Sequence, residues 1–440
     1  MAEIVAGFPF WKIKFDEHGQ PEDAATIEAF INEVKAQGLT DLFIFSHGWN
    51  NSESTALNLY TGFFGEMRKL VDDASLTDRR QAKIGASGVV WPSILLPDEQ
   101  PEDATGGAVS LGSGGSKGDM FEELKKVFLN DQQQQTLGEL KQLFDQKQKS
   151  EAALKQVKVK LSQLIGASKI SEKSQDNLEQ RGILGDDDNW REVFEALADQ
   201  ESSEESEGGA AGFGDKFKRL WNGAKAALRS TTYWQMKDRA GVIGRTGLGP
   251  LIGRLHNAAP DLKVHLLGHS FGARLVSYAL SGLPDLPQGS KSPVKTLFLL
   301  QGAFSHFTFA DALPFDKKRK GDLAGMAVRV DGPLLTTHSL KDLAVGTAYP
   351  LASVVAGQDA ADAQDTLFRW GAMGHDGAQS VDAQQLQLGR PSTAYPFQIG
   401  KWTNLDGNQV IVNGGPPAGA HSDIVHPHTA WAALAAAGIK

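Results

Sequence analysis

The sequence predicts an α/β protein whose core is a doubly wound, mostly parallel β-sheet. Two patterns in the 440 residues indicate this class: short, continuous apolar runs recur along the chain, and amphipathic segments of helical period separate them. Continuous apolar runs are typical of strands buried on both faces, and strands that alternate with helices are typical of a parallel sheet. A third observation limits the core: residues 97–230 differ in character, with a helical pattern rich in Gln and Lys over 120–165.

The elements of the core are expected in a regular order. The run at 8–15 alternates apolar and polar residues and is predicted to be an edge strand. The other strands are expected within 41–51, 84–91, 264–269, 295–302 and 328–337. The helices between and after them are expected over 24–37, 55–71, 238–259, 275–280 and 429–437. We therefore assign the core to residues 1–96 and 231–440.

Residues 97–230 are expected to form a helical insertion in this core. Apolar residues recur at helical spacing over 120–165, which predicts a helical hairpin of short coiled-coil character, and a further helix is expected over 190–197. The Gly- and Ser-rich stretch 103–117 and the acidic run 201–209 are expected to be mobile, solvated loops. We expect the insertion to act as a cap or lid, and the alternative is a surface that binds a protein partner.

Composition excludes several classes of protein. The net charge of −9 argues against a nucleic-acid or anionic-membrane surface. No stretch approaches the about 20 apolar residues that span a bilayer, and the N-terminal residues lack the pattern of a secretory signal. Cysteine is absent, so disulfides, thiolate metal sites and cysteine nucleophiles are excluded. We expect a cytoplasmic protein with no integral membrane segment, no nucleic-acid partner and no cofactor.

The segment Gly268-His269-Ser270-Phe271-Gly272 carries the main functional signal. An apolar run precedes it and a helical pattern follows it, which is the setting in which G-x-S-x-G forms a nucleophile elbow. The turn forces the serine into a strained conformation, and the glycines leave room for strand and helix to pack closely. Ser270 is thus the expected nucleophile. The Phe271 N–H, at a helix N-terminus, is the expected first oxyanion donor.

Three segments together resemble the α/β-hydrolase superfamily, and in particular a group of its bacterial members of largely unassigned function. They are 268–272, the residues 337–339 that precede Asp342, and 419–424, which contain His421. The resemblance covers 8–96 and 231–440 and does not extend to the insertion. It implies the α/β-hydrolase fold with an inserted cap or lid, and the chain order nucleophile, acid, histidine.

The resemblance also implies a second oxyanion donor in the loop after the third strand. The apolar run that begins at Asp41 ends in His47-Gly48-Trp49. The Trp49 N–H would be the second donor, and Gly48 would let the backbone approach the substrate. The alternative is that His47 and Trp49 only close the end of a strand.

The implied chain order places the catalytic acid after Ser270. Asp342 lies a few residues past an expected strand, where a carboxylate can orient an imidazole through its Nδ1–H, and it is our choice. Asp331 is the rival, but it precedes Gly-Pro and is expected to lie in a turn. Asp311 follows the preceding strand and comes too early in the order of elements.

The base is expected just before the last helix. His421 follows a glycine-rich segment there and is preferred to His426, which is expected near the N-cap of that helix; His375, in a polar loop, is a weaker rival. A metal site made of His421, Asp423, His426 and His428 is the alternative, but the spacing matches no trusted ligand pattern. The long span between Asp342 and His421 is expected to add a hairpin or a second lid.

These residues predict a serine hydrolase. His421 would take the proton of Ser270, Ser270 would attack an acyl carbonyl, and Asp342 would hold the imidazolium. Trp49, Trp91 and Phe271 suggest an apolar acyl pocket. We expect a small-molecule or lipid ester as the substrate of an esterase- or lipase-like enzyme. The alternatives are a thioesterase or amidase with the same triad, a membrane-lipid lipase, and a non-catalytic scaffold that binds a partner through the insertion.

Overall fold

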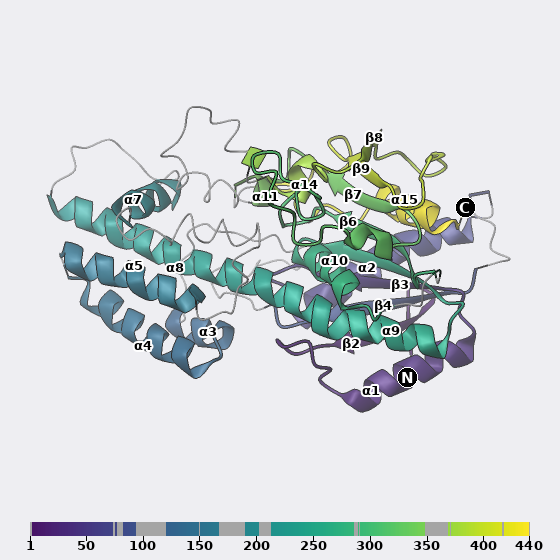
Figure 1. Cartoon of the computed structure of the whole chain (residues 1–440), viewed down its shortest axis with the longest axis horizontal. Coiled ribbons are helices and arrows are strands. Elements are labelled where there is room, and N and C mark those ends of the chain that lie inside the picture. The colour runs from purple at the N-terminus through teal and green to yellow at the C-terminus, as the bar shows by residue number, and fades with distance from the viewer. Residues whose placement is uncertain are drawn as a thin grey trace.

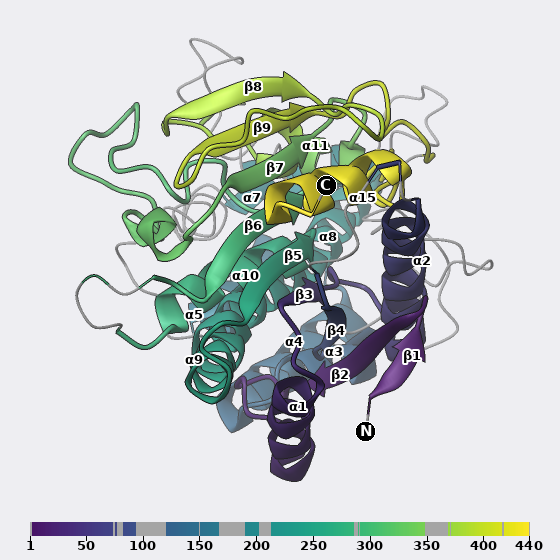
Figure 2. The same cartoon turned by 90° about the vertical axis from the view of Figure 1, so that its right-hand side faces the viewer.

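One nine-stranded sheet forms the centre of the molecule (Figure 2). The structure is a computed structural model that describes residues 2–73, 75–76, 82–93, 120–148, 150–166, 190–201, 213–285, 289, 291–347, 368–369, 371–415 and 418–439. The strand order is β1-β2-β4-β3-β5-β6-β7-β9-β8. Their bounds are β1 Glu3–Val5, β2 Phe8–Lys14, β3 Asp41–Ser46, β4 Ile84–Val90, β5 Lys263–His269, β6 Val294–Leu300, β7 Leu334–His338, β8 Ala383–Gln387 and β9 Trp402–Asp406.

The pairing of these strands confirms the predicted α/β class with a mostly parallel sheet. β1 is antiparallel to β2, and every other pair in the described sheet is parallel. The buried strand β3 lies between β4 and β5 and is fully buried along its length. Its side chains alternate between two cores, with Leu42 and Ile44 in one and Phe43 and Phe45 in the other, as the period of a strand requires.

Helices cover both faces of the sheet (Figure 2). α1 Ala24–Gln37, α9 Gly249–Ala258 and α10 Phe271–Gly282 contribute to the core on one face, whereas α2 Glu53–Asp72 and α15 Pro427–Ala437 contribute to the other. Their ends follow local chemistry. α1, for example, begins after Asp23, whose carboxylate accepts the N–H groups of Ala25 and Thr26, and it ends at Gly38 in the left-handed conformation.

A group of helices extends to one side of the sheet (Figure 1). It comprises α3 Met120–Val127, α4 Asp131–Gln146, α5 Glu151–Gly166, α7 Trp190–Glu201 and the 31-residue α8 Phe213–Ile243. Within the expected hairpin over 120–165, α4 and α5 pack against each other across the turn that begins at Lys147. The segment differs from the expectation in one respect, because Asn130 caps α4 and so separates a further helix, α3, from the pair. The expected loop 103–117 and nearly all of 201–209 lie outside the described residues.

The long helix α8 connects this group to the sheet. It runs through residue 230, where we expected the insertion to end, and packs against α7 at one end and α10 at the other. Arg239 near its C-terminal end donates to the carbonyls of Pro92 (2.8 Å) and Val127 (2.9 Å), and burial lowers the pKa of its guanidinium to about 10. No helix in the described part of the chain is long and apolar enough to cross a membrane.

The structure corrects three expectations about the sheet and its helices. The strand at 8–15 is not at the edge, because β1 pairs with its outer side. The strand expected over 328–337 begins only at Leu334, after a 3₁₀ turn at Met326–Arg329. The helix expected over 238–259 is divided between α8 and α9 by a π-helical turn at Gly244–Leu248.

The span between Asp342 and His421 also differs from the expectation. It contains the short helices α11 Leu343–Thr347 and α14 Met373–Asp376, and the strands β8 and β9. These two strands are parallel to each other, and β9 pairs with β7, so they extend the sheet and do not form a hairpin.

Candidate active site

Ser270 occupies a sharp turn between β5 and α10. Its backbone has φ 57° and ψ −123°, a conformation that costs non-glycine residues on the order of 1–3 kcal/mol and is concentrated at functional sites. Three backbone hydrogen bonds hold it there: its N–H donates to Leu300 (3.1 Å), and its carbonyl accepts from Ala273 (3.1 Å) and Ala303 (3.3 Å). The structure therefore places the predicted nucleophile at a rigid, strained strand-to-helix turn.

The two glycines of the motif permit this turn by close packing. A Cβ atom at Gly268 would lie 2.4 Å from the carbonyl oxygen of Gly272, and a Cβ atom at Gly272 would lie 2.0 Å from that of Ser46. Both distances are far below van der Waals contact, so strand β5, helix α10 and the end of β3 can meet only where no side chain intervenes.

The loop after β3 approaches Ser270 from the other side. A Cβ atom at Gly48 would lie 2.6 Å from Ser270 Cβ and 3.1 Å from its Oγ. The Gly48 carbonyl accepts from His47 Nδ1 (2.8 Å) and Asn51 Nδ2 (3.3 Å). Because the carbonyl and N–H of a trans peptide point in opposite directions, the Trp49 N–H points away from these two side chains.

Buried contacts fix this loop. The Tyr60 hydroxyl donates to Val89 (2.5 Å) and accepts the His47 N–H (2.9 Å). The Trp91 indole N–H donates to the His47 carbonyl (3.0 Å), and its ring stacks on the His47 imidazole. Burial lowers the pKa of His47 to about 4, so the imidazole is neutral at physiological pH. Trp91, which we expected to line an acyl pocket, thus contacts His47 through both its ring and its indole N–H.

Among the described residues, two backbone amides beside Ser270 have no backbone acceptor. None of the backbone hydrogen bonds among the described residues uses the Trp49 N–H, and the Phe271 N–H begins α10 and has no acceptor within the helix. The rings of these two residues stack with centroids 6.1 Å apart, and Tyr233 of α8 packs against both. The predicted oxyanion residues therefore lie together under an aromatic cover.

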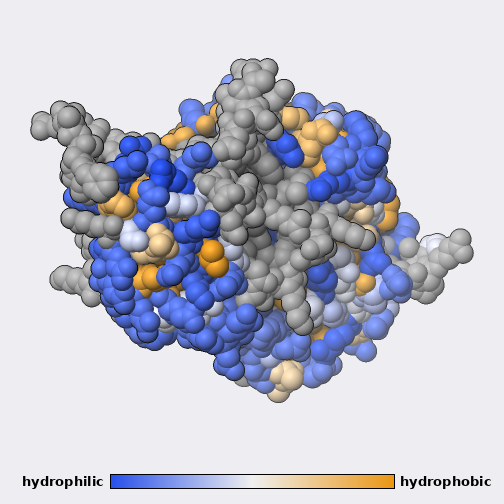
Figure 3. Space-filling model, turned by 60° about the vertical axis from the view of Figure 1, so that its left-hand side comes forward, coloured by the Kyte–Doolittle hydropathy of each residue, from blue (hydrophilic) through white to orange (hydrophobic). Residues whose placement is uncertain are grey.

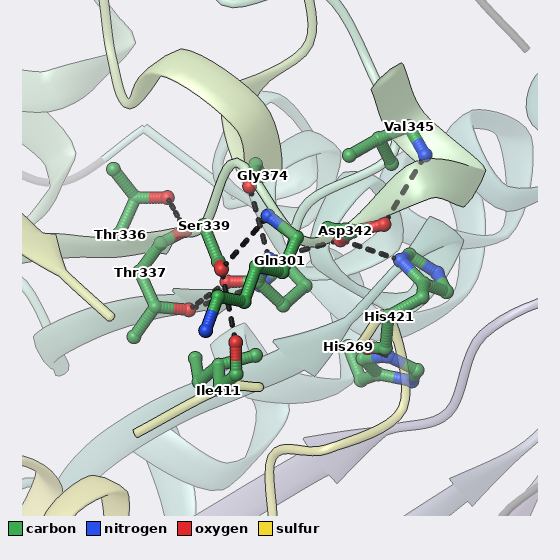
Figure 4. Close-up of polar contacts among 11 residues, drawn as sticks. His269, Gln301, Thr336, Thr337, Ser339, Asp342, Val345, Gly374, Ile411 and His421 are labelled. Carbon is green, nitrogen blue, oxygen red and sulfur yellow. Dashed lines mark hydrogen bonds and ion pairs between the residues drawn. The ribbon is translucent and has the colours of Figure 1, made fainter. Parts of the chain in front are cut away.

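The predicted acid and base form a buried pair. Asp342 Oδ2 lies 2.8 Å from His421 Nδ1, and both side chains are almost fully buried (Figure 4). The segments that carry them are joined by an antiparallel bridge between Asp342 and Gly419, and the Ala420 N–H donates to Lys341 (2.8 Å). The carboxylate can therefore orient the imidazole and stabilise its protonated form.

Asp342 has two further hydrogen-bond donors (Figure 4). The Val345 N–H reaches Oδ1 (3.2 Å), and the side-chain amide of Gln301 reaches Oδ2 (2.9 Å). Gln301 is not distinguished by the sequence alone, because a glutamine after an apolar strand has no distinctive pattern. The only sequence feature that points to Gln301 is its position, as a polar residue at the carboxyl end of a strand expected next to the elbow strand.

His269 connects the elbow to the base. Its Nε2 lies 2.9 Å from the carbonyl oxygen of His421, and the two rings are 4.9 Å apart. Burial, followed by the neighbouring His421, lowers the pKa of His269 to about 3, so it is neutral and donates through Nε2–H. Among the described residues no hydrogen bond joins Ser270 Oγ to His421. Nucleophile–base contacts are often long in ligand-free enzymes.

The rival residues have other partners or positions. Asp331 pairs with Lys295 at the far end of β6, and Asp311 is exposed on a loop. His426 caps α15 and its Nε2 lies 2.9 Å from Asp423 Oδ1. His375 lies in α14, with its Nε2 3.8 Å from Asp376. No group of three or more His, Asp or Glu side chains in the described ranges is arranged to hold a metal ion.

Comparison of the chain with protein-family models, with curated proteins and with solved structures finds no match.

Proposed function

We propose that this protein is a serine hydrolase with an α/β-hydrolase fold that cleaves carboxylic esters. One observation carries the proposal: a serine in a strained strand-to-helix turn and a buried Asp–His pair follow the chain order Ser270, Asp342, His421, and His269, the residue before the serine, is hydrogen-bonded to the His421 carbonyl. This order and the position of the serine are those of α/β-hydrolases. Support also comes from the loop after β3, which brings Gly48 against Ser270.

The proposed reaction uses each group at a stated atom. His421 Nε2 takes the proton of Ser270 Oγ as that oxygen attacks the acyl carbon, and Asp342 stabilises the imidazolium through Nδ1–H. The N–H groups of Phe271 and Trp49 receive the oxyanion, and each such donor is worth on the order of 10²–10³ in rate. Protonation of the leaving alcohol by His421 gives the acyl-enzyme, which water then hydrolyses.

The surroundings of the amides favour an apolar acyl group. Trp49, Phe271 and Tyr233 form a continuous aromatic contact beside the proposed oxyanion donors. A thioester would use the same groups, and an amide would demand more of them, because an amine is a poorer leaving group than an alcohol or a thiol.

Tyr233 also relates the helical group to the site. It lies on α8, so a movement of that helix would move one wall of the proposed acyl site, as a cap or lid requires. A lid that binds membrane lipid would expose an apolar face. The described surface seen in Figure 3 is mainly hydrophilic, with scattered apolar residues, which favours a small-molecule ester.

Labelling with a fluorophosphonate probe, together with hydrolysis of p-nitrophenyl esters of several chain lengths, tests the proposal. We expect the wild type to be labelled, Ser270→Ala to be unlabelled, and Asp342→Ala and His421→Ala to be labelled far more slowly. His426→Ala is the matched control and should react as the wild type does. A folded wild type that neither reacts with the probe nor cleaves any ester would refute the enzyme and favour the scaffold that binds a partner through the helices.

A further inference from the structure

Gln301 lies directly after β6, at the carboxyl edge of the sheet, between the nucleophile and the acid. Its side chain is completely buried, and its backbone φ is +47°, a left-handed conformation that is uncommon outside glycine. We infer that Gln301 is a positioning residue that holds the catalytic acid and couples it mechanically to the nucleophile. This inference rests on the proposed function of Ser270, Asp342 and His421.

The side chain of Gln301 makes hydrogen bonds through every polar atom. Its Nε2 donates to Asp342 Oδ2 (2.9 Å) and to the carbonyl of Gly374 (2.9 Å), and its Oε1 accepts from the Thr337 hydroxyl (2.9 Å) (Figure 4). A carboxylate and a carbonyl can only accept, so the orientation of the amide is determined by its partners. The amide has no freedom to rotate away from Asp342.

Gln301 and His421 hold the same oxygen of the acid. Both Gln301 Nε2 and His421 Nδ1 lie within 2.9 Å of Asp342 Oδ2, while the Val345 N–H reaches Oδ1. Three donors from three separate segments thus fix both the position and the plane of the carboxylate. Without Gln301, the carboxylate of Asp342 would be held only by the Val345 N–H and by the imidazole of His421. The imidazole cannot serve as a fixed support, because it is the group that the carboxylate has to orient.

The backbone on both sides of Gln301 is bonded to the nucleophile. The Leu300 carbonyl accepts the Ser270 N–H (3.1 Å), and the Ala303 N–H donates to the Ser270 carbonyl (3.3 Å). The Gln301 N–H in turn donates to Thr337 Oγ1 (3.1 Å). The backbone of residues 300–303 therefore holds the elbow at Ser270, and the Gln301 side chain holds the acid Asp342. The left-handed conformation of Gln301 allows one residue to face both.

Replacement of the amide while the side-chain size is kept tests the inference. Gln301→Met removes the amide, and we expect kcat for a p-nitrophenyl ester to fall about 10- to 100-fold with KM nearly unchanged, because Gln301 contacts the acid and not the substrate. Gln301→Glu places a second carboxyl group beside Asp342. Such a pair shares one proton, so activity should be retained at low pH and should fall as the proton is lost, which adds a new inflection to the pH profile.

A second readout does not depend on activity. The Nδ1–H proton between His421 and Asp342 should give a low-field resonance in the proton NMR spectrum of the wild type, and Gln301→Met should shift or broaden it. Thr336→Val is the matched control: Thr336 is equally buried on the neighbouring strand, and its hydroxyl contacts neither Gln301 nor Asp342. The Thr336→Val variant should keep the low-field resonance and the pH profile of the wild type even if its Tm differs.

The outcomes separate the inference from the proposed function. A folded Gln301→Met with wild-type kcat, pH profile and low-field resonance overturns the positioning role while Ser270 remains the nucleophile. A wild type that hydrolyses no ester refutes the function, and the resonance still decides the role of Gln301. If Gln301→Met does not fold, Gln301→Gly removes the same amide at a position whose φ glycine readily adopts, and the same results apply to it.

Discussion

Substitution of Gly48 by alanine tests the contact between the loop after β3 and the nucleophile. The new Cβ would lie 2.6 Å from Ser270 Cβ, about 0.8 Å closer than the 3.4 Å at which ordinary contact begins. Ser270 is held by three backbone hydrogen bonds and the loop by Tyr60, so the two segments must separate by a good part of this distance. A misplacement near 1 Å can cost about 10²-fold in rate, and the loss of one oxyanion donor costs about 10²–10³.

We therefore expect Gly48→Ala to lower kcat/KM for a p-nitrophenyl ester about 100-fold, equivalent to about 2.7 kcal/mol of transition-state stabilisation. The control is Gly65→Ala in α2, where a Cβ atom meets nothing within 4 Å and alanine favours the helix. Its kcat/KM should equal that of the wild type and its Tm should be slightly higher. A folded Gly48→Ala enzyme within twofold of the wild-type kcat/KM would refute the proposed approach of this loop to the reacting carbonyl.

Three further predictions address the elbow, the base and the acid. Gly272→Ala places a Cβ atom 2.0 Å from the Ser46 carbonyl oxygen, so urea unfolding should show a loss of at least about 3 kcal/mol, or no folded protein. His269 has a pKa lowered to about 3 by burial, so below pH 6.5 the unfolded chain binds a proton that the folded chain does not. Lowering the pH from 7.5 to 5 should therefore reduce the free energy of unfolding by about 2 kcal/mol through His269. Urea unfolding should show that His269→Gln abolishes this contribution, whereas His18→Gln, at an exposed histidine, leaves it unchanged. Asp342→Asn should lower kcat about 10⁴-fold, because the imidazole loses its carboxylate, and a loss below tenfold would contradict the role of the acid.

The elbow was predictable because its signals are local. Gly268 and Gly272 flank Ser270 at a fixed spacing between a strand and a helix, and the backbone angles of the serine follow from that spacing. Asp342 and His421 were chosen from the chain order that the resemblance implies. The structure brings them within hydrogen-bond distance although 79 residues separate them.

The parts that were missed depend on contacts far along the chain. β8 carries mostly exposed polar residues and is a strand only because its backbone pairs with β9. Asn130 separates α3 from the following helices through cap geometry that hydrophobic period does not reveal. Gln301 is recognisable only once Asp342 lies beside it, because nothing within β6 distinguishes that side chain.

The order of the strands explains why the site takes this form. β3, β5, β6 and β7 are adjacent and parallel, so their carboxyl ends present the Gly48 loop, Ser270, Gln301 and Asp342 in that order along one edge. Neighbouring strands are about 4.8 Å apart, which leaves nucleophile and acid separated by two strand spacings, about 10 Å. His421 joins the two sides of that gap: its imidazole is hydrogen-bonded to the acid, and its backbone carbonyl accepts from His269 of the elbow strand. Gln301 follows β6, the strand between those that carry Ser270 and Asp342, so it lies between the two residues. A side chain at this position either holds them in place or keeps them apart. Because the segment of Gln301 is hydrogen-bonded to both Ser270 and Asp342, it holds them in place.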